Sequence, residues 1–288
     1  MTEPLLFADL RIDRVLEDEI PLRPALGTLI GLTPEVLAEN RAWLQPDALD
    51  AQDVLRVAIQ SFLVRTPHHT ILIDSCVGND KAIERMPVWH KKTDTNFMDG
   101  LAALGVGLEA IDYVLCTHLH VDHVGWNTRL ENGRWVPTFP NARYVFGRTE
   151  YDHWHAENAK AENTVFTDSV LPVVQADRAD LVADEFGIGD HLRLLPTPGH
   201  TPGHVSVALG AERDEAVVSG DVLHSPLQTR YPDLSIVFDS DPAKAVKSRR
   251  GFLERYAETP TICCMTHFPS PSIGRLKRWG EGFRCEYL

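Results

Sequence analysis

The sequence predicts an α/β fold in which two mixed sheets face each other and helices cover the outside. The chain has 288 residues, of which 43% are apolar, so it can bury a large core. Short strand-like runs dominate, and helical patterns alternate with the later ones. No internal repeat, low-complexity segment or long linker divides the chain, so we expect a single domain over residues 1–288.

The predicted strands are short apolar runs that end in turn residues. They cover residues 10–17, 54–66, 70–75, 113–117, 143–147, 192–197, 204–210, 215–220 and 261–266. The clearest helix begins at Asp241 and Pro242, which suit the N-cap and first helical position. Further helices are predicted near 94–104, 148–158 and 165–175.

The segment at about 21–50 differs from the rest because it holds several prolines around one helical pattern, PEVLAENRAWL. We interpret it as a surface excursion that packs on the core. A lid or a dimer arm is the alternative, because long loops are often functional.

Charge, hydropathy and cysteine content limit the partners and the location that we expect for the protein. Asp and Glu number 41 against 28 Lys and Arg, a formal net charge of -13, so nucleic acid and anionic membranes are disfavoured as partners and a small-molecule substrate is expected. The sequence leaves undecided whether the protein forms a homodimer.

The N-terminus lacks a basic start followed by an apolar run, and no later stretch reaches the ~20 apolar residues of a membrane span, so we expect a cytoplasmic, unprocessed protein. Five cysteines without CxxC spacing suggest neither a disulfide framework nor a zinc finger.

The most informative segment is CTHLHVDHVGWN, residues 116–127, which follows an apolar strand. His118 and His120 are two residues apart, so on a strand or tight turn they face the same way and can bind one ion. Asp122 and His123 can supply a second ion, and imidazole and carboxylate suit zinc and similar metals. Without a cation, so many polar groups in one short run would repel and desolvate one another.

Three later residues repeat this arrangement, because each begins a loop after an apolar strand: His200, Asp221 and His267. Alone, each would more often be a structural histidine or a turn aspartate. Ligands at several strand ends along one edge of a sheet share a pocket, so the repetition favours a common site. The predicted metal ligands are His118, His120, Asp122, His123, His200, Asp221 and His267.

The motifs THLHVDHVG, PGHTPGH, SGD and the late THF resemble, in the same order, those of the metallo-β-lactamase superfamily, from about residue 54 to 270. The resemblance implies a four-layer αββα sandwich and two divalent metal ions, with zinc favoured and Mn, Fe or Co left open. It also implies that Asp221 and a hydroxide bridge the metals, and that Asp74 orients a metal-bound histidine; a turn or N-cap role is the alternative for Asp74. One metal would be held by His118, His120 and His200, and the other by Asp122, His123 and His267.

Two metals that share an activated water suit substrates that need only attack and charge stabilisation: lactones, esters, thioesters, β-lactams and phosphoesters. The extended N-terminal segment, ILIDSCVGN, VDHVGWN, SGDVLHSPLQ and THFPSP resemble the branch of quorum-quenching N-acyl homoserine lactonases and methyl parathion hydrolase-like enzymes. We therefore expect a lactonase. The alternatives are a glyoxalase II-like thioesterase, an organophosphate triesterase and, outside enzymes, a metal-binding scaffold.

The resemblance also bears on the residues that would touch the substrate. Many lactonases of this branch have a tyrosine three residues after the bridging aspartate, where this chain has His224. We expect His224 to line the pocket and donate a hydrogen bond to substrate or leaving group, with Asp122 and Asp221 as the other catalytic residues; a surface turn is the alternative for His224. His204 is expected to be a core histidine or to orient a ligand. Apolar pocket walls, or plain core, are expected at Trp89, Trp126 and Phe268.

Overall fold

The computed structural model describes residues 3–183 and 185–288. The described residues form two compact units. Unit 1 lies within 1–18 and 59–184, and unit 2 comprises 19–58 and 185–288. Strands β2 (Arg11–Pro24) and β4 (Val54–Arg65) belong to both units along the chain. The prediction of a single domain stays a prediction, and Met1, where we expected no processing, lies outside the described residues.

Unit 1 contains a mixed sheet with the strand order β1-β2-β4-β5-β6-β9-β10. Strands β5, β6, β9 and β10 pair in parallel, whereas β4 pairs with β5 in antiparallel orientation. Because parallel strands end at the same edge, the loops after β5 and β6 emerge together. The remaining strands of this sheet are β1 (Leu5–Leu6), β5 (Thr70–Ile73), β6 (Tyr113–Leu115), β9 (Arg143–Gly147) and β10 (Ala179–Val182).

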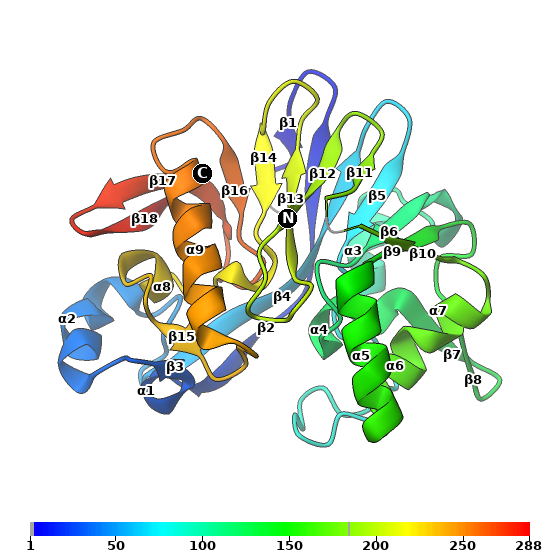
Figure 1. Cartoon of the computed structure of the whole chain (residues 1–288), viewed down its shortest axis with the longest axis horizontal. Coiled ribbons are helices and arrows are strands. Elements are labelled where there is room, and N and C mark those ends of the chain that lie inside the picture. Colours follow the sequence, from blue (N-terminus) through cyan, green and yellow to red (C-terminus); the bar gives the residue numbers. More distant parts are fainter. Residues whose placement is uncertain (1–2, 184) are drawn as a thin grey trace. The chain divides into compact units, whose positions relative to one another are not determined.

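The helices of unit 1 flank this sheet. Helix α5 (Arg148–Lys160), green in Figure 1, lies beside β9 and β10. The predicted helix at 165–175 is divided into two at Val170, where the backbone leaves the first helix and Pro172, in the first turn of the second, has no N–H to donate. The other elements are α3 (Asn96–Ala103), η1 (Leu108–Ala110), α4 (Val121–Val124), η2 (Gly125–Asn127), β7 (Thr128–Glu131), β8 (Arg134–Pro137), α6 (Thr164–Ser169) and α7 (Leu171–Gln175).

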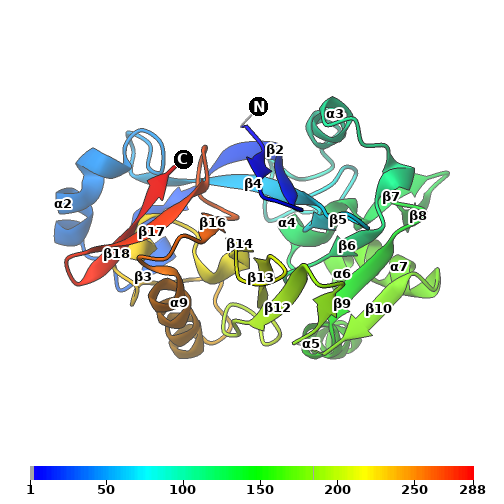
Figure 2. The same ribbon diagram turned by 90° about the horizontal axis from the view of Figure 1, so that it is seen from above.

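Unit 2 contains the second sheet, with the order β11-β12-β13-β14-β16-β17-β18. All neighbours are antiparallel except β14 and β16. Helix α9 (Pro242–Tyr256) lies on one face of this sheet, as Figure 2 shows, and buries Phe252 and Leu253 against Val217 and Leu276. The strands are β11 (Gly187–Ile188), β12 (Leu192–Pro196), β13 (Val205–Leu209), β14 (Ala216–Val218), β16 (Ile262–Cys264), β17 (Ile273–Trp279) and β18 (Gly282–Tyr287).

Residues of the segment at 21–50 pack on the core of unit 2. Leu37, Leu44 and Leu49 join one buried apolar cluster with Leu227 and Ile236. The elements of this region are α1 (Ala25–Thr28), β3 (Leu29–Ile30), α2 (Pro34–Leu44), η3 (Gly220–Val222), α8 (Leu227–Arg230) and β15 (Ser235–Ile236).

The prediction of an α/β fold with two mixed sheets is confirmed, and every predicted strand has a counterpart in the structure. The N-cap of α9 is also confirmed, because the Asp241 side chain accepts a hydrogen bond from the Lys244 N–H at 3.0 Å. The β17–β18 hairpin was not predicted. All five cysteines are free thiols. Across the described residues, none of the helices has the length and apolar character needed to cross a membrane.

Candidate metal centre

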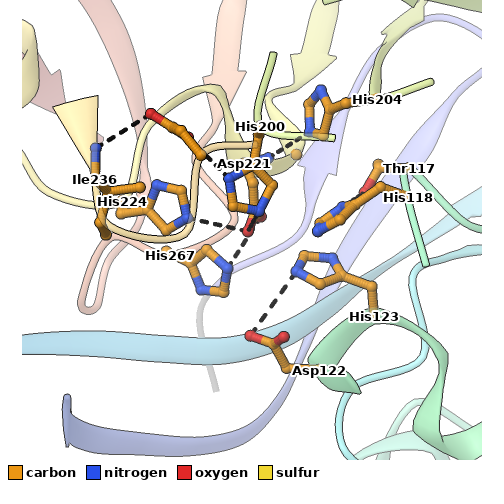
Figure 3. Close-up of polar contacts among 12 residues, drawn as sticks. Thr117, His118, Asp122, His123, His200, His204, Asp221, His224, Ile236 and His267 are labelled. Atoms are coloured by element: carbon orange, nitrogen blue, oxygen red, sulfur yellow. Dashed lines mark hydrogen bonds and ion pairs between the residues drawn. The ribbon is translucent and has the colours of Figure 1, made fainter. Parts of the chain in front are cut away.

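The histidines of the predicted metal motif gather in unit 1, on the segment that runs from the end of β6 into α4. His118 and His123 are fully buried, and their ring centroids are 4.0 Å apart. The ring of His120 lies 4.6 Å from that of His118. Asp122 lies in the first turn of α4, and its Oδ2 is 3.8 Å from His123 Nε2 (Figure 3). The loop therefore brings its three imidazoles and one carboxylate together.

Asp74 holds this loop in place from the end of β5. Its Oδ2 lies 2.9 Å from His123 Nδ1, and its Oδ1 accepts a hydrogen bond from the Thr117 N–H at 2.7 Å. We assign the Nδ1 proton of His123 to this contact, so Nε2 carries the lone pair. A carboxylate that fixes the tautomer in this way is the usual partner of a metal-binding histidine. The orienting role expected for Asp74 thus has a direct structural basis.

Glu150, in the first turn of α5, also secures the loop and was missed from the sequence. It is buried, and its Oε1 accepts hydrogen bonds from the Leu119 N–H at 3.1 Å and from Trp154 Nε1 at 2.6 Å. The Trp154 ring lies 5.5 Å from that of His120. No sequence pattern marks Glu150, because a glutamate in the first turn of a helix is ordinary.

Gly125 is required by close packing of the backbone behind this loop. A Cβ at this position would lie 1.7 Å from the Val77 carbonyl oxygen. Gly125 N–H donates to the Cys76 carbonyl, and Trp126 N–H donates to the Ser75 carbonyl, both at 2.8 Å. The glycine of the VDHVG motif therefore allows the segment after Asp74 to lie directly against the end of α4.

In unit 2 the predicted ligands surround one carboxylate, that of Asp221. His200 Nε2 lies 3.2 Å from Asp221 Oδ2, and His267 Nε2 lies 3.0 Å from Oδ1. His224 Nε2 lies 3.1 Å from Oδ2. All of these side chains are buried, and Figure 3 shows the histidines converging on Asp221. Nitrogen atoms of His224 and His267 and an oxygen of Asp221 lie within 4.8 Å of one another, close enough to share an ion.

The opposite ring nitrogens of two of these histidines are also fixed. His200 Nδ1 lies 3.0 Å from Asp239 Oδ1, and His267 Nδ1 lies 2.9 Å from the Ala58 carbonyl oxygen. Both contacts are satisfied by a proton on Nδ1, so Nε2, which faces Asp221, is the nitrogen available to a metal ion once any proton it carries is displaced. Asp239 was not predicted, although it follows the apolar run SIVF as the predicted ligands follow theirs.

His204 is placed to support the site rather than to bind an ion. Its Nε2 accepts the Asp221 N–H at 2.7 Å, and its Nδ1 lies 3.1 Å from the Thr197 carbonyl oxygen. Both ring nitrogens are thus used in holding the backbone. Gly220 makes this possible, because its φ is +56° and a Cβ there would lie 2.6 Å from His204 Nε2. The sequence-based interpretation of His204 agrees with this geometry.

Burial and charge set the protonation of the unit 2 histidines. Burial alone would lower the pKa of His200, but hydrogen bonds and charges from Asp221 and Asp239 raise it to about 9. Burial lowers the pKa of His224 to about 4, so its imidazole is neutral at pH 7. Burial would raise the pKa of Asp239, yet its contacts with His200 lower it to about 2. The anionic environment that retains a proton on His200 is also one that stabilises a cation.

Two of the aromatic residues expected as pocket walls belong to the interior. Trp126 Nε1 donates to Glu17 Oε1 at 2.7 Å, and its ring stacks on Phe97 with centroids 5.5 Å apart. Phe268 is fully buried in the core cluster beneath α9. The alternative of plain core therefore describes both residues, because packing and a buried hydrogen bond account for them. Trp89 is likewise buried.

The donor groups present are of the kinds that bind divalent transition metals. Unit 1 supplies imidazoles and the Asp122 carboxylate, and unit 2 supplies imidazoles and the Asp221 carboxylate, which are the ligand types of zinc sites. The second ring nitrogen of His123, His200 and His267 is held by a carboxylate or a carbonyl, as in metal-bound histidines.

The family is also established by comparison with known proteins. The profile of the metallo-beta-lactamase superfamily matches residues 55–267, and the chain belongs to that superfamily. A curated N-acyl homoserine lactonase from Bacillus cereus is 25% identical over 176 residues, which are 58% of this chain. The match spans 64% of the length of that relative.

Solved structures are similar over almost the whole chain. A structure described as the hydrolase AbOPH in the beta lactamase superfamily has a TM-score of 0.80 and 26% identity, covering 99% of this chain and 96% of that one. AidC, described as a dizinc quorum-quenching lactonase in complex with a product, has a TM-score of 0.81 and 19% identity, covering 99% and 97%. The predicted superfamily fold is thereby confirmed.

Proposed function

We propose that the chain is a dinuclear metal-dependent hydrolase that opens lactones of the N-acyl homoserine type. One observation carries the proposal: in a chain of this superfamily, His123, His200 and His267 each have Nδ1 held by an acceptor, which leaves Nε2 to bind a metal. A scaffold without metal chemistry has no need of three such arrangements.

The ligands divide into two sets in this proposal, following the order of the superfamily motifs. His118, His120 and His200 hold one zinc ion, and Asp122, His123 and His267 hold the other. Asp221 would be a ligand as well, because His200 Nε2 and His267 Nε2 each lie close to one of its carboxylate oxygens. When bound, the pair of ions would lower the pKa of a shared water and polarise the substrate carbonyl.

The chain's own residues orient the ligands and handle the substrate. His204 holds the backbone N–H of Asp221, and Asp74 holds His123. His224, neutral at pH 7, contacts the Asp221 carboxylate through Nε2. We propose that His224 also faces the substrate, where it would donate a hydrogen bond to the substrate oxygen or leaving group.

The lactone substrate is supported by the relatives. The curated protein from Bacillus cereus is named an N-acyl homoserine lactonase, and AidC is described as a quorum-quenching lactonase. A lactone needs only a nucleophile and stabilisation of charge on oxygen, both of which a dinuclear centre supplies.

The test is metal analysis of the purified protein followed by a substrate panel: N-acyl homoserine lactones, aryl esters, S-lactoylglutathione and methyl paraoxon. We expect about two metal ions per chain and the highest kcat/KM on the lactones, with activity abolished by a chelator and restored by zinc. A preference for the thioester would replace the lactonase proposal with a glyoxalase II-like function, and a preference for methyl paraoxon would replace it with triester hydrolysis. Lactone turnover unaffected by complete metal removal would overturn the metal mechanism.

A further inference from the structure

Arg249, in the middle of α9, has a fully buried guanidinium that donates hydrogen bonds to several backbone carbonyls. Its Nε donates to the Val222 carbonyl at 2.8 Å. Its Nη1 donates to the carbonyls of Pro232 and Leu234 at 3.1 and 2.7 Å. Burying a charge is costly unless it is paired and hydrogen-bonded, so this geometry needs a compensating partner.

The partner is Asp239. Its Oδ2 lies 3.5 Å from Arg249 Nη2 and accepts hydrogen bonds from Ser235 Oγ at 2.8 Å and from the Ile236 N–H at 3.1 Å. Its other oxygen, Oδ1, lies 3.0 Å from His200 Nδ1. Oδ2 of Asp239 is therefore held by Ser235, the Ile236 backbone and Arg249, whereas Oδ1 contacts the predicted metal ligand His200.

Arg249 also contacts the backbone beside Asp221, the proposed shared metal ligand. Val222, whose carbonyl receives Arg249 Nε, follows Asp221 directly in the chain. A single guanidinium thus fixes the loop that carries Asp221 and, through Asp239, the ring of His200. Removal of either side chain would leave buried polar groups without partners.

We infer that Asp239 and Arg249 are positioning residues that set how tightly the chain binds the metal ion held by His200. Asp239 holds a proton on His200 Nδ1, so that Nε2 faces Asp221 as the metal-binding nitrogen; Arg249 fixes Asp239. This inference rests on the proposed role of His200 as a metal ligand. Neither residue contacts the substrate in this scheme.

The chain offers a matched control one residue further along α9. Arg250 is exposed and pairs with Asp233, with its Nε and Nη2 at 2.7 and 2.6 Å from the two carboxylate oxygens. Arg249→Met and Arg250→Met therefore remove the same group from the same helix, and only the first removes it from the network.

The experiment measures zinc affinity by competition with a chromophoric chelator, and the His200 tautomer by ¹⁵N NMR of the zinc-saturated protein. The variants are Asp239→Asn, Arg249→Met, Arg249→Lys, Arg250→Met and His200→Ala. We expect Asp239→Asn and Arg249→Met to weaken the binding of one of the two zinc ions by about 10- to 100-fold. Both variants should also shift the ¹⁵N resonances of the His200 ring. Arg249→Lys should recover part of the loss, and Arg250→Met should match the wild type.

Wild-type affinity for both ions and an unchanged His200 spectrum in folded Asp239→Asn would overturn the inference. Asp239→Asn still tests the inference if Arg249→Met fails to fold, because asparagine and aspartate side chains have nearly the same size. His200→Ala separates the two proposals: if it too leaves both zinc affinities unchanged, the proposed metal centre is wrong and not only the role of Asp239.

Discussion

The two units supply the predicted metal ligands in different ways. In unit 1 His118, His120, Asp122 and His123 come from one short loop, and Asp74 and Glu150 hold it. In unit 2 the ligands come from separate loops after β12, β14 and β16. A contiguous loop needs few supports, whereas ligands from distant segments need a buried polar network to align them.

In unit 2 such a network surrounds Asp221. Arg249 joins the loop of Asp221 to Asp239 and His200, while His204 holds the Asp221 N–H. We expect substitutions in unit 2 to act through several neighbours at once, and substitutions in unit 1 to act more locally.

The largest effect is expected for removal of one ligand from each unit. His118→Ala and Asp221→Ala should each lower kcat/KM by roughly 1,000-fold or more, because each removes a group that binds metal directly. The measurement is lactonase kinetics together with zinc content and circular dichroism. His68→Ala, at an exposed turn, is the control and should retain full activity. Activity within a few-fold of the wild type in either ligand variant would contradict the ligand assignment.

The same contrast explains what the sequence could predict. The candidate ligands of unit 1 could be predicted because histidines and an aspartate crowd into one motif, and those of unit 2 because each follows an apolar strand. Their supports could not be found in this way. Arg249 and Arg250 are neighbours of the same type, and only tertiary packing makes one buried and the other exposed. Glu150 resembles any acidic residue in the first turn of a helix.

The sequence likewise predicted some strands of the fold and missed others. Apolar runs predicted the central strands, because both of their faces are buried. The β17–β18 hairpin was missed because Arg275, Lys277 and Arg278 interrupt its pattern, although Ile273 and Leu276 are buried. A strand with only one face on the core has too few apolar residues to be distinguished from a loop.

The second prediction concerns the carboxylates behind the ligands. Asp74→Asn should weaken binding of the zinc ion held by His123 by about 10- to 100-fold, because the amide no longer fixes the Nδ1 proton by charge. Zinc competition titration measures the effect, with Asp152→Asn, exposed on α5, as the control. If the two units act independently, Asp74→Asn and Asp239→Asn should affect different ions and add in free energy. Loss of the same ion in both variants would show that the comparison between the units is mistaken.

The third prediction tests the backbone contact of His204. His204→Leu leaves the Asp221 N–H buried without its acceptor, so the free energy of unfolding of the metal-free protein should fall by about 1–3 kcal/mol. His204→Gln, whose side-chain oxygen can accept a hydrogen bond, should lose less. Urea unfolding measures both. Equal stability of the leucine variant and the wild type would mean that this contact does not hold the Asp221 loop.

The smallest effect concerns the buried cation of unit 1, Lys81, which differs from Arg249 of unit 2 in being able to lose its proton. Its Nζ donates to Thr128 Oγ1 at 2.6 Å and lies 3.5 Å from the centre of the Trp135 ring. Burial nevertheless lowers its pKa from 10.5 to about 7. Between these two values the unfolded chain binds a proton that the folded chain does not, so the free energy of unfolding should rise with pH from about 7 upward.

The rise should be about 1 kcal/mol between pH 7 and 8, since one pKa unit corresponds to about 1.4 kcal/mol. Urea unfolding at pH 6, 7, 8 and 9 measures it, and the difference in stability between the wild type and Lys81→Met isolates this group from all others. The exposed Arg250 stays charged throughout this range and lies outside the His200 network, so the wild type and Arg250→Met should differ by the same amount at each pH. A pH-independent difference for Lys81→Met would mean that Lys81 keeps its charge as well. Hydrogen bonds and the Trp135 ring would then stabilise the buried ammonium of unit 1 as fully as carbonyls and Asp239 stabilise the guanidinium of unit 2.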